Sequence, residues 1–149
     1  MLKFRMLLIA LLVCKVALTQ LNIADSFKST LTKNLPDTLK IDLINDYISK
    51  YSPNDPGVAL TYSDSAISLS LKCKDSLRLA NSFNRKGIAL YYIGDYNTSL
   101  ENYFHALSVK EEIGENSTLW REYNNIGLVL RNIDLNEEAL KYFNQALKN

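Results

Sequence analysis

The side chains that could carry chemistry in this sequence are few, and their spacing matches no catalytic or metal-binding pattern. The chain has one histidine, His105, and a general acid or base needs a partner within hydrogen-bonding reach. Glu101 stands four residues earlier, which on a helix is an ordinary neighbour rather than a catalytic partner. Cys14 and Cys73 are too few for a four-ligand zinc site, and the five glycines form no phosphate-binding loop. We therefore predict a protein that is not an enzyme and that uses no cofactor or metal ion.

Length, composition and charge narrow the class of protein further. The sequence has 149 residues, of which 47% are hydrophobic, and this is enough for one globular domain with a core. The 17 basic and 16 acidic residues nearly cancel, leaving a formal net charge of +1. A charge so close to zero lacks the basic excess that binds nucleic acid, so we expect no nucleic-acid partner.

The N-terminal residues have the pattern of a secretory signal peptide. Lys3 and Arg5 supply a basic start, Met6–Val13 is an unbroken apolar run, and small residues precede Gln20. This order of segments is typical of a signal that is cleaved during export. We predict that residues 1–19 are a signal peptide and that the mature chain is exported to the periplasm or cell envelope.

The same segment is too short to anchor the protein stably in a membrane. A bilayer-spanning helix needs about 20 apolar residues, and Lys15 interrupts this run well before that length. We therefore expect no stable membrane span in this chain. The alternative interpretation is a short N-terminal helix on a protein that stays in the cytoplasm.

An internal repeat with a constant step organises the remainder of the chain. The dipeptide Ala59-Leu60 recurs as Ser99-Leu100 and again as Ala139-Leu140, and Ala66-Ile67 recurs at the same step as Ala106-Leu107 and Ala146-Leu147. Gly87 and Gly127 keep this step, and so do several residues around them. Because a period of about 40 residues is typical of stacked structural units, we predict a repeat architecture.

Each repeat is expected to form two helices, because apolar residues recur at spacings of three and four. The helices are predicted over residues 41–51 and 57–72, 77–93 and 96–112, and 119–133 and 137–148. Gly94 supplies a positive-φ position that ends a helix, and Asp95 is an expected cap for the next one. Asp55 is likewise an expected cap, with Pro56 at a first helical position. A closing glycine and a capping serine are expected before the fifth helix: Gly114 and Ser117.

A small residue lies where the two helices of the second repeat are expected to approach. Gly87 stands in the middle of the first helix, facing the second. We expect the missing side chain to let the two backbones come close. Larger residues are expected to fill the space around it: Phe83, Leu90 and Tyr103.

These markers together resemble the tetratricopeptide repeat. The second repeat carries the pattern through Asn84, Gly87, Leu90-Tyr91, Ile93-Gly94-Asp95-Tyr96, Ser99-Leu100, Tyr103 and Ala106-Leu107. The third matches at Tyr123, Gly127, Leu130, Ala139, Phe143 and Ala146, and the first more weakly at Asp55-Pro56, Ala59, Tyr62 and Ala66. The common repeat has about 34 residues, so the longer step implies a variant with longer helices. The late proline of the family is absent, and Glu111 stands at its position in the second repeat.

The resemblance implies an all-α fold, an α-α superhelix in which three helix-turn-helix units form a solenoid. It places the units at about residues 40–79, 80–119 and 120–149, within a TPR-like domain of residues 39–149. Residues 20–38 are then an N-terminal helix or linker. The family also implies a non-enzymatic scaffold that binds a peptide or protein segment, so we expect a protein or peptide partner.

In solenoids of this kind the first helices of successive units line a concave groove. Carried onto this sequence, the partner-binding groove would consist of Asn84, Ile88, Tyr91, Tyr92, Arg121, Asn124, Leu128 and Arg131. Such side chains suit an extended peptide, since Tyr offers contact area, Asn pairs with backbone amides and Arg with carboxylates. The alternative for each residue is a place in the core between units. Ile44 and Ile48 replace the basic residue and asparagine of the family's chaperone-tail clamp, so that specificity is not expected.

Two features leave alternatives open for the whole protein. A repeat of this length behind a signal peptide also resembles the exported N-terminal part of certain bacterial sensor kinases and helix-turn-helix regulators. The alternative function is therefore a truncated sensory input region of a histidine kinase or transcriptional regulator. The last predicted helix presents an apolar edge that either a continuing chain or self-association would cover: Leu140, Phe143 and Leu147.

Overall fold

The computed structural model of the protein describes residues 25–148, and its contacts separate two units between Leu35 and Pro36. In the first unit, residues 25–31 are helical. The predicted signal peptide, residues 1–19, lies outside the described residues. None of the described helices is long and apolar enough to cross a membrane.

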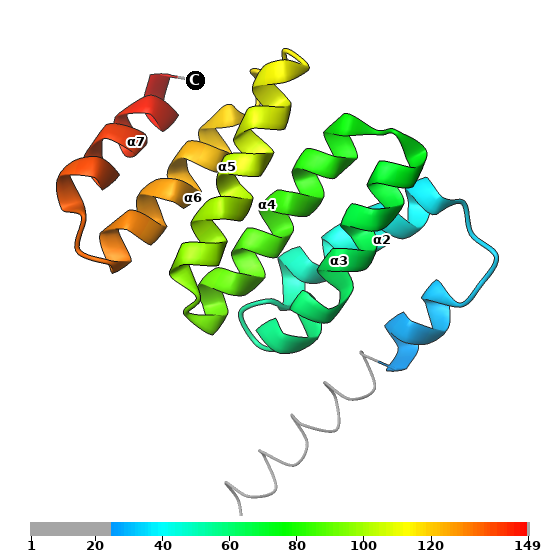
Figure 1. Ribbon diagram of the computed structural model, residues 1–149. Helices are drawn as coiled ribbons and strands as arrows, with labels where there is room; N and C mark the ends of the chain where they lie inside the picture. Colours follow the sequence, from blue (N-terminus) through cyan, green and yellow to red (C-terminus); the bar gives the residue numbers. More distant parts are fainter. Residues whose placement is uncertain (1–24, 149) are drawn as a thin grey trace, which may run out of the picture. The chain divides into compact units, whose positions relative to one another are not determined.

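The second unit is built of helices, as the repeat pattern predicted. Its elements are α2 Asp37–Tyr51, α3 Pro56–Cys73, α4 Ser76–Ile93, α5 Tyr96–Glu112, α6 Leu119–Asn132 and α7 Asn136–Lys148 (Figure 1). No strand occurs among the described residues, and the predicted all-α class is confirmed. Each predicted helix is present, with its ends within one residue of the expected positions except at the start of α2.

Helix α2 begins at Asp37 rather than at the expected Ile41. The extra turn has a single apolar residue, the exposed Leu39, so the apolar periodicity could not indicate it, but its residues suit a helix start. Asp37 places a negative charge at the helix N-terminus, which the helix dipole favours. The same carboxylate accepts a hydrogen bond from Lys72 Nζ over 2.7 Å, which ties the start of α2 to the end of α3.

Aspartates begin three of the helices, and two of these caps were predicted. Asp55, Asp75 and Asp95 each accept a hydrogen bond from the backbone N–H three residues later, over 3.2, 2.9 and 3.2 Å respectively. Gly94 ends α4 with a φ of 88°, and Gly114 follows α5 with a φ of 70°. Both glycines thus supply the left-handed conformation that was expected of them.

The predicted cap of α6 at Ser117 is wrong. Thr118 is the residue before α6, and its side chain makes no capping hydrogen bond. Ser117 instead donates its hydroxyl proton to Glu115 Oε1 over 2.5 Å, because the carboxylate two residues earlier competes for it. This hydrogen bond lowers the pKa of Glu115 below its ordinary value.

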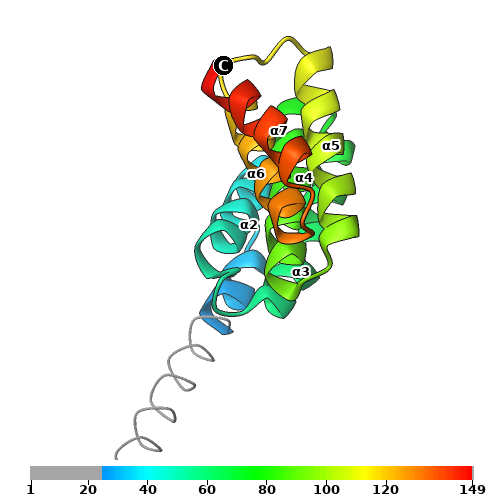
Figure 2. The ribbon, with the colours of Figure 1, turned by 90° about the vertical axis from the view of Figure 1, so that its left-hand side faces the viewer.

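The helices of the second unit pair as three hairpins, α2–α3, α4–α5 and α6–α7, that stack side by side (Figure 1). Each second helix also contacts the first helix of the next hairpin. The first helices α2, α4 and α6 contact one another in order, and Figure 2 shows α2 and α5 on opposite sides of the unit. Asn84 meets Glu122 and Tyr91 meets Asn132, so α4 and α6 run parallel. The first helices therefore form one layer and the second helices another.

Two glycines on the first helices make room for aromatic rings of the second helices. A Cβ atom on Gly87 would lie 2.7 Å from Tyr103 Cε1, and one on Gly127 would lie 2.6 Å from Phe143 Cε1. The sequence predicted that the opposite backbone would approach Gly87, but the group that comes close is the ring of Tyr103. The hydroxyl of Ser99 donates to the carbonyl oxygen of Gly87 over 2.8 Å and holds the two helices together.

A buried ion pair joins the second hairpin to the third. Lys110 Nζ lies 2.9 Å from Glu122 Oε1, and both side chains are almost completely inaccessible to solvent. Asn84 donates to the same carboxylate oxygen over 3.0 Å, and Lys110 also donates to the hydroxyl oxygen of Thr118 over 3.0 Å. These charge-assisted hydrogen bonds link α4, α5 and α6 at one point.

The equivalent junction between the first and second hairpins is neutral. Ser70 and Ser82 occupy the same repeat positions as Lys110 and Glu122, and their hydroxyl oxygens lie 3.4 Å apart. Asn45 of α2 donates a hydrogen bond to Ser82 Oγ over 3.2 Å. At the charged junction, Asn84 of α4 donates in a similar way to the carboxylate of Glu122. The same repeat positions thus carry two hydroxyls at one junction and an ion pair at the other.

Replacing Gly87 with alanine is expected to destabilise the fold by about 1–3 kcal/mol, because the added methyl group overlaps the buried ring of Tyr103. Urea denaturation followed by circular dichroism measures the effect. Gly57→Ala is the matched control, since a Cβ atom there meets nothing closer than Asp55 Oδ1 at 3.9 Å. Equal stability of Gly87→Ala and the unmodified chain would contradict the packing of Gly87 on Tyr103.

Replacing Lys110 with methionine is expected to cost about 3–5 kcal/mol, because Glu122 then remains buried without its counter-charge. Adding Glu122→Gln should recover more than half of this loss, since glutamine keeps an acceptor for Asn84 and removes the charge. The exposed pair Lys86–Asp64 is the control, and Lys86→Met should change the free energy of unfolding by less than about 1 kcal/mol. A Lys110→Met variant as stable as Lys86→Met would refute the role assigned to the buried pair.

Candidate functional site

The layer of first helices contains a hollow that we call the inner hollow. Its volume is about 220 Å³, and its lining comes from α2, α4, α5, α6 and the turn after α2: Ser49, Pro53, Ile88, Tyr91, Tyr92, Tyr103, Asn125 and Leu128. Each of the three hairpins therefore contributes residues to this one site. A chain segment lying across the first helices would contact all three hairpins.

Two tyrosines of α4 form part of the lining, and they differ in how firmly they are held. The rings of Tyr91 and Tyr92 lie 5.5 Å apart between centroids and are nearly perpendicular, at 82°. The hydroxyl oxygen of Tyr91 accepts a hydrogen bond from Asn132 Nδ2 over 2.7 Å, which ties α4 to α6. Tyr92 is 47% exposed, so its ring presents contact area to solvent.

The remaining lining combines aliphatic groups with a few polar ones. Ile88 of α4 and Leu128 of α6 are half-buried, while Tyr103 is buried and lies against Gly87. Burial raises the pKa of Tyr103 well above its ordinary value. A largely apolar hollow with a few hydrogen-bonding groups suits a bulky apolar side chain of a partner.

Four of the eight predicted groove residues come together in the inner hollow: Ile88, Tyr91, Tyr92 and Leu128. All four lie on the first helices of the second and third hairpins, where the repeat pattern placed the groove. That these side chains bind a partner stays a prediction.

Asn84 belongs to the junction network instead, and we do not retain it in the site. Its side chain is buried and donates to Glu122 Oε1 over 3.0 Å. A buried carboxylate needs such donors, so the amide of Asn84 is committed inside the protein. The sequence pattern could not separate this inward position from the open face of the same helix.

The other three predicted residues do not line the inner hollow. Asn125 lines it in place of Asn124, because one residue corresponds to a rotation of about 100° around a helix. Arg121 is exposed, and its guanidinium carbon lies 5.2 Å from the centroid of the Trp120 ring. Arg131 is also exposed, beyond the hollow on α6.

Sequence reasoning missed Ser49, Pro53 and Tyr103. Tyr103 lies on a second helix, so the repeat pattern assigned it to the core rather than to the groove. It reaches the hollow because Gly87 has no side chain to block its ring. The pairing of a glycine on the first helix with an aromatic residue on the second was the signal that could have revealed this position.

The side chains of metal-ligating type lie apart from the inner hollow, whose lining is aromatic, aliphatic, hydroxyl and amide. Within residues 25–148, no three side chains of the metal-ligating types converge. His105 is exposed, and its ring centroid lies 5.2 Å from that of Phe83, outside the hollow lining. What the inner hollow offers a ligand is apolar area with hydrogen-bonding groups at its margin.

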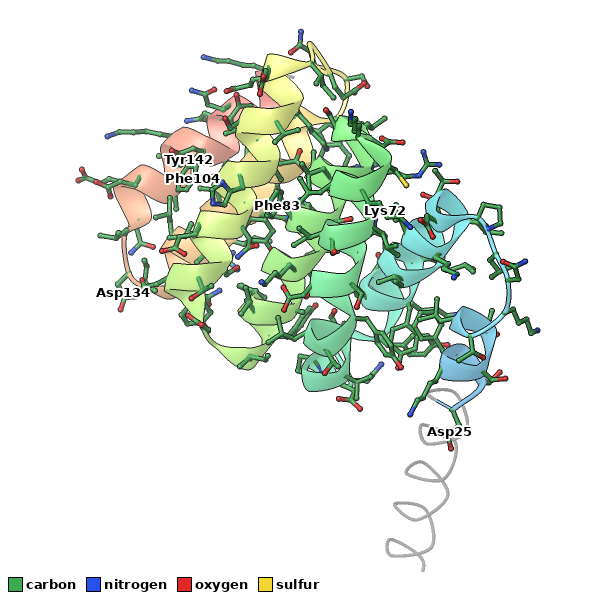
Figure 3. The ribbon with its side chains drawn as sticks, turned by 45° about the vertical axis from the view of Figure 1, so that its right-hand side comes forward. Asp25, Lys72, Phe83, Phe104, Asp134 and Tyr142 are labelled. Carbon is green, nitrogen blue, oxygen red and sulfur yellow. The ribbon has the colours of Figure 1, made fainter. Side chains whose placement is uncertain are left out.

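The predicted apolar edge of the last helix is smaller than expected. Leu140 and Leu147 of α7 are 60% and 84% exposed. Phe143, predicted with them, is half-buried because its ring packs over Gly127. Tyr142 turns toward α5, where its ring lies 6.1 Å from that of Phe104 (Figure 3).

Comparison with known proteins supports the fold. No protein-family model matches the sequence, and no curated protein matches it either. The structure is similar to the crystal structure of the TPR domain of Arabidopsis FLU, with a TM-score of 0.69 and 18% sequence identity over 76% of this chain and 96% of that chain. The chain therefore has a TPR-like helical solenoid fold.

Proposed function

We propose that this protein is an interaction scaffold that binds an extended segment of a partner protein in the inner hollow. The observation that carries the proposal is the composition of the hollow, to which Ser49, Tyr91 and Leu128 contribute from three successive hairpins. An extended chain crossing α2, α4 and α6 would make contacts with each of them. The TPR-like fold supports the same class of function.

The size of the hollow favours one side chain of a protein partner over a small-molecule ligand. Pockets for small molecules usually enclose about 300–1,000 Å³. The inner hollow encloses about 220 Å³ and is bordered by the exposed ring of Tyr92. One anchoring side chain in the hollow and backbone contacts beside it would match this geometry.

We also propose that the three hairpins are equivalent repeats of the longer type, in a domain that begins near residue 39. The correspondence of the two junctions supports this step, because Ser70 matches Lys110 and Ser82 matches Glu122 in the repeat. The extra length relative to the common repeat lies in long helices, such as the 18-residue α3 and α4.

Peptide selection tests the proposed function directly. The full chain is used to select from a displayed library of random dodecapeptides, and selected peptides are measured by fluorescence anisotropy. Leu128→Asp is expected to weaken binding about tenfold or more, because it places an unpaired charge against the apolar anchor.

Two further variants keep this test decisive. Tyr92→Ala removes an exposed ring and should weaken binding without changing the circular dichroism spectrum. Leu71→Asp is the matched control, because Leu71 is 58% exposed on α3 and lies outside the inner hollow. Failure to select any peptide, or equal binding by Leu128→Asp and Leu71→Asp, would overturn the proposal.

Export is the remaining part of the proposed function, and it rests on the sequence of residues 1–19. Expression of the full chain in a bacterium is expected to yield protein that begins at Gln20, as read by N-terminal sequencing of the envelope fraction. Leu8→Arg should prevent cleavage by breaking the apolar run. Recovery of the unmodified chain with Met1 intact in the cytoplasm would contradict export.

A further inference from the structure

We propose that a second hollow, at the turn between α3 and α4 (Figure 1), binds a primary alkylammonium group, the chemistry that a partner's lysine side chain shares with a free aliphatic amine. This junction hollow has a volume of about 250 Å³ and is lined by six residues: Ser70, Leu71, Lys74, Asp75, Ser76 and Leu79. It shares no lining residue with the inner hollow, so it is a separate site. Leu71 and Leu79 offer apolar contacts to the methylene groups of such a ligand.

The internal repeat indicates which group suits this hollow. Ser70 and Asp75 stand at the repeat positions of Lys110 and Glu115. The side chain of Lys110 is almost completely buried, and its ammonium group lies 2.9 Å from Glu122 Oε1. Because the serine side chain is short, position 70 leaves open the space that a lysine side chain would take. At about 250 Å³, against about 30 Å³ for a water molecule in the liquid, the hollow exceeds the space that one ordered water needs.

The buried polar groups beside the junction hollow have acceptor capacity to spare. The hydroxyl of Ser70 donates to the carbonyl oxygen of Ala66 over 2.8 Å, and that of Ser82 donates to the carbonyl oxygen of Arg78 over 2.9 Å. Both hydroxyl protons are thus committed, and the oxygen of Ser70 keeps its lone pairs. Asn45 donates to Ser82 Oγ, and its own Oδ1 is buried with no hydrogen-bond partner among the described residues. An ammonium group brings three donors and no acceptor, whereas a hydroxyl or an amide adds an acceptor.

The charges around the junction hollow also favour a cation. Arg78 pairs with both Asp42 and Asp75, so two carboxylates face one guanidinium group and one negative charge is in excess. Each oxygen of Asp75 accepts one hydrogen bond from Arg78, and a carboxylate oxygen can accept a second. Lys74 lines the hollow too, but its side chain is exposed and can extend into solvent, away from a bound cation.

Titration of the isotope-labelled full chain with n-butylammonium chloride, followed by two-dimensional NMR, tests the inference. Backbone amide signals of Leu71, Ser76 and Leu79 are expected to shift and to saturate at about millimolar concentration, because so small a ligand makes few contacts. Signals of Ile88 and Leu128 in the inner hollow should not move. n-Butanol has the same stem with a neutral head group and should bind about tenfold more weakly or less, since it lacks the charge-assisted hydrogen bonds.

The charge requirement is isolated by Asp75→Asn, because asparagine caps a helix about as well as aspartate. This variant should weaken n-butylammonium binding about fivefold or more and leave n-butanol binding unchanged. Asp95→Asn is the matched control, since Asp95 caps α5 through the same type of hydrogen bond and lies outside the junction hollow. It should change the binding of neither ligand.

The space requirement is tested by the double variant Ser70→Lys/Ser82→Glu, which gives the first junction the same residue types as Lys110 and Glu122. The introduced side chain should fill the junction hollow and abolish n-butylammonium binding, with an unchanged circular dichroism spectrum. A double variant that folds and binds n-butylammonium as well as the unmodified chain does would overturn the site. Asp75→Asn decides the question even where the double variant does not fold.

N-acetyl-lysine N-methylamide distinguishes the two sources of the ammonium group. Binding at least as tight as that of n-butylammonium would assign the hollow to a lysine side chain of a partner, and weaker binding would assign it to a free amine. Three results would overturn the inference. These are equal binding of n-butanol and n-butylammonium, equal binding by Asp75→Asn and the unmodified chain, and the absence of any shift at the lining residues.

Discussion

The buried ion pair between Lys110 and Glu122 is the constraint on which the docking of the third hairpin against the second depends. Removing both charges from water costs several kcal/mol, so the pair is tolerable only where each charge is held against the other and given further hydrogen bonds. Glu122 Oε1 receives Lys110 Nζ from α5 and the amide of Asn84 from α4. The third hairpin therefore docks on the second in one register, since any slip would leave a buried charge unpaired.

This register shapes the candidate site. Two hydrogen bonds join α4 to α6. One links Asn84 to Glu122, and the other links Tyr91 to Asn132 further along both helices. The lining residues of α4 and α6 that lie between these hydrogen bonds in sequence are Ile88, Asn125 and Leu128. These three lining residues therefore lie on the stretch of α4 and α6 that the two hydrogen bonds bracket. Binding surfaces built on rigid helices in this way need little reorganisation when a partner arrives.

Variation at equivalent repeat positions gives each junction a different chemistry. Ser70 and Ser82 form a neutral contact where Lys110 and Glu122 form a charged one, although all four side chains are buried. A charged junction tolerates only its own partner, whereas hydroxyls tolerate several. The two junctions of the solenoid therefore differ in chemistry although their helices share one sequence pattern.

The sequence by itself determined the helices, their turns and their pairing, because periodicity, aspartate caps and positive-φ glycines act locally. Of the groove residues that it predicted on α4 and α6, Ile88, Tyr91, Tyr92 and Leu128 line one hollow. Only the tertiary structure decided the rotation of each helix about its axis. This rotation buries Asn84, which was predicted to lie in the groove, and it places Asn125 rather than the predicted Asn124 in the lining of the hollow. The physical reason is that a repeat pattern assigns a helix face to within about one residue. Which face of a helix turns inward is set by tertiary contacts. These are the pairing of buried charges from distant segments and the packing of a ring into the space beside a glycine.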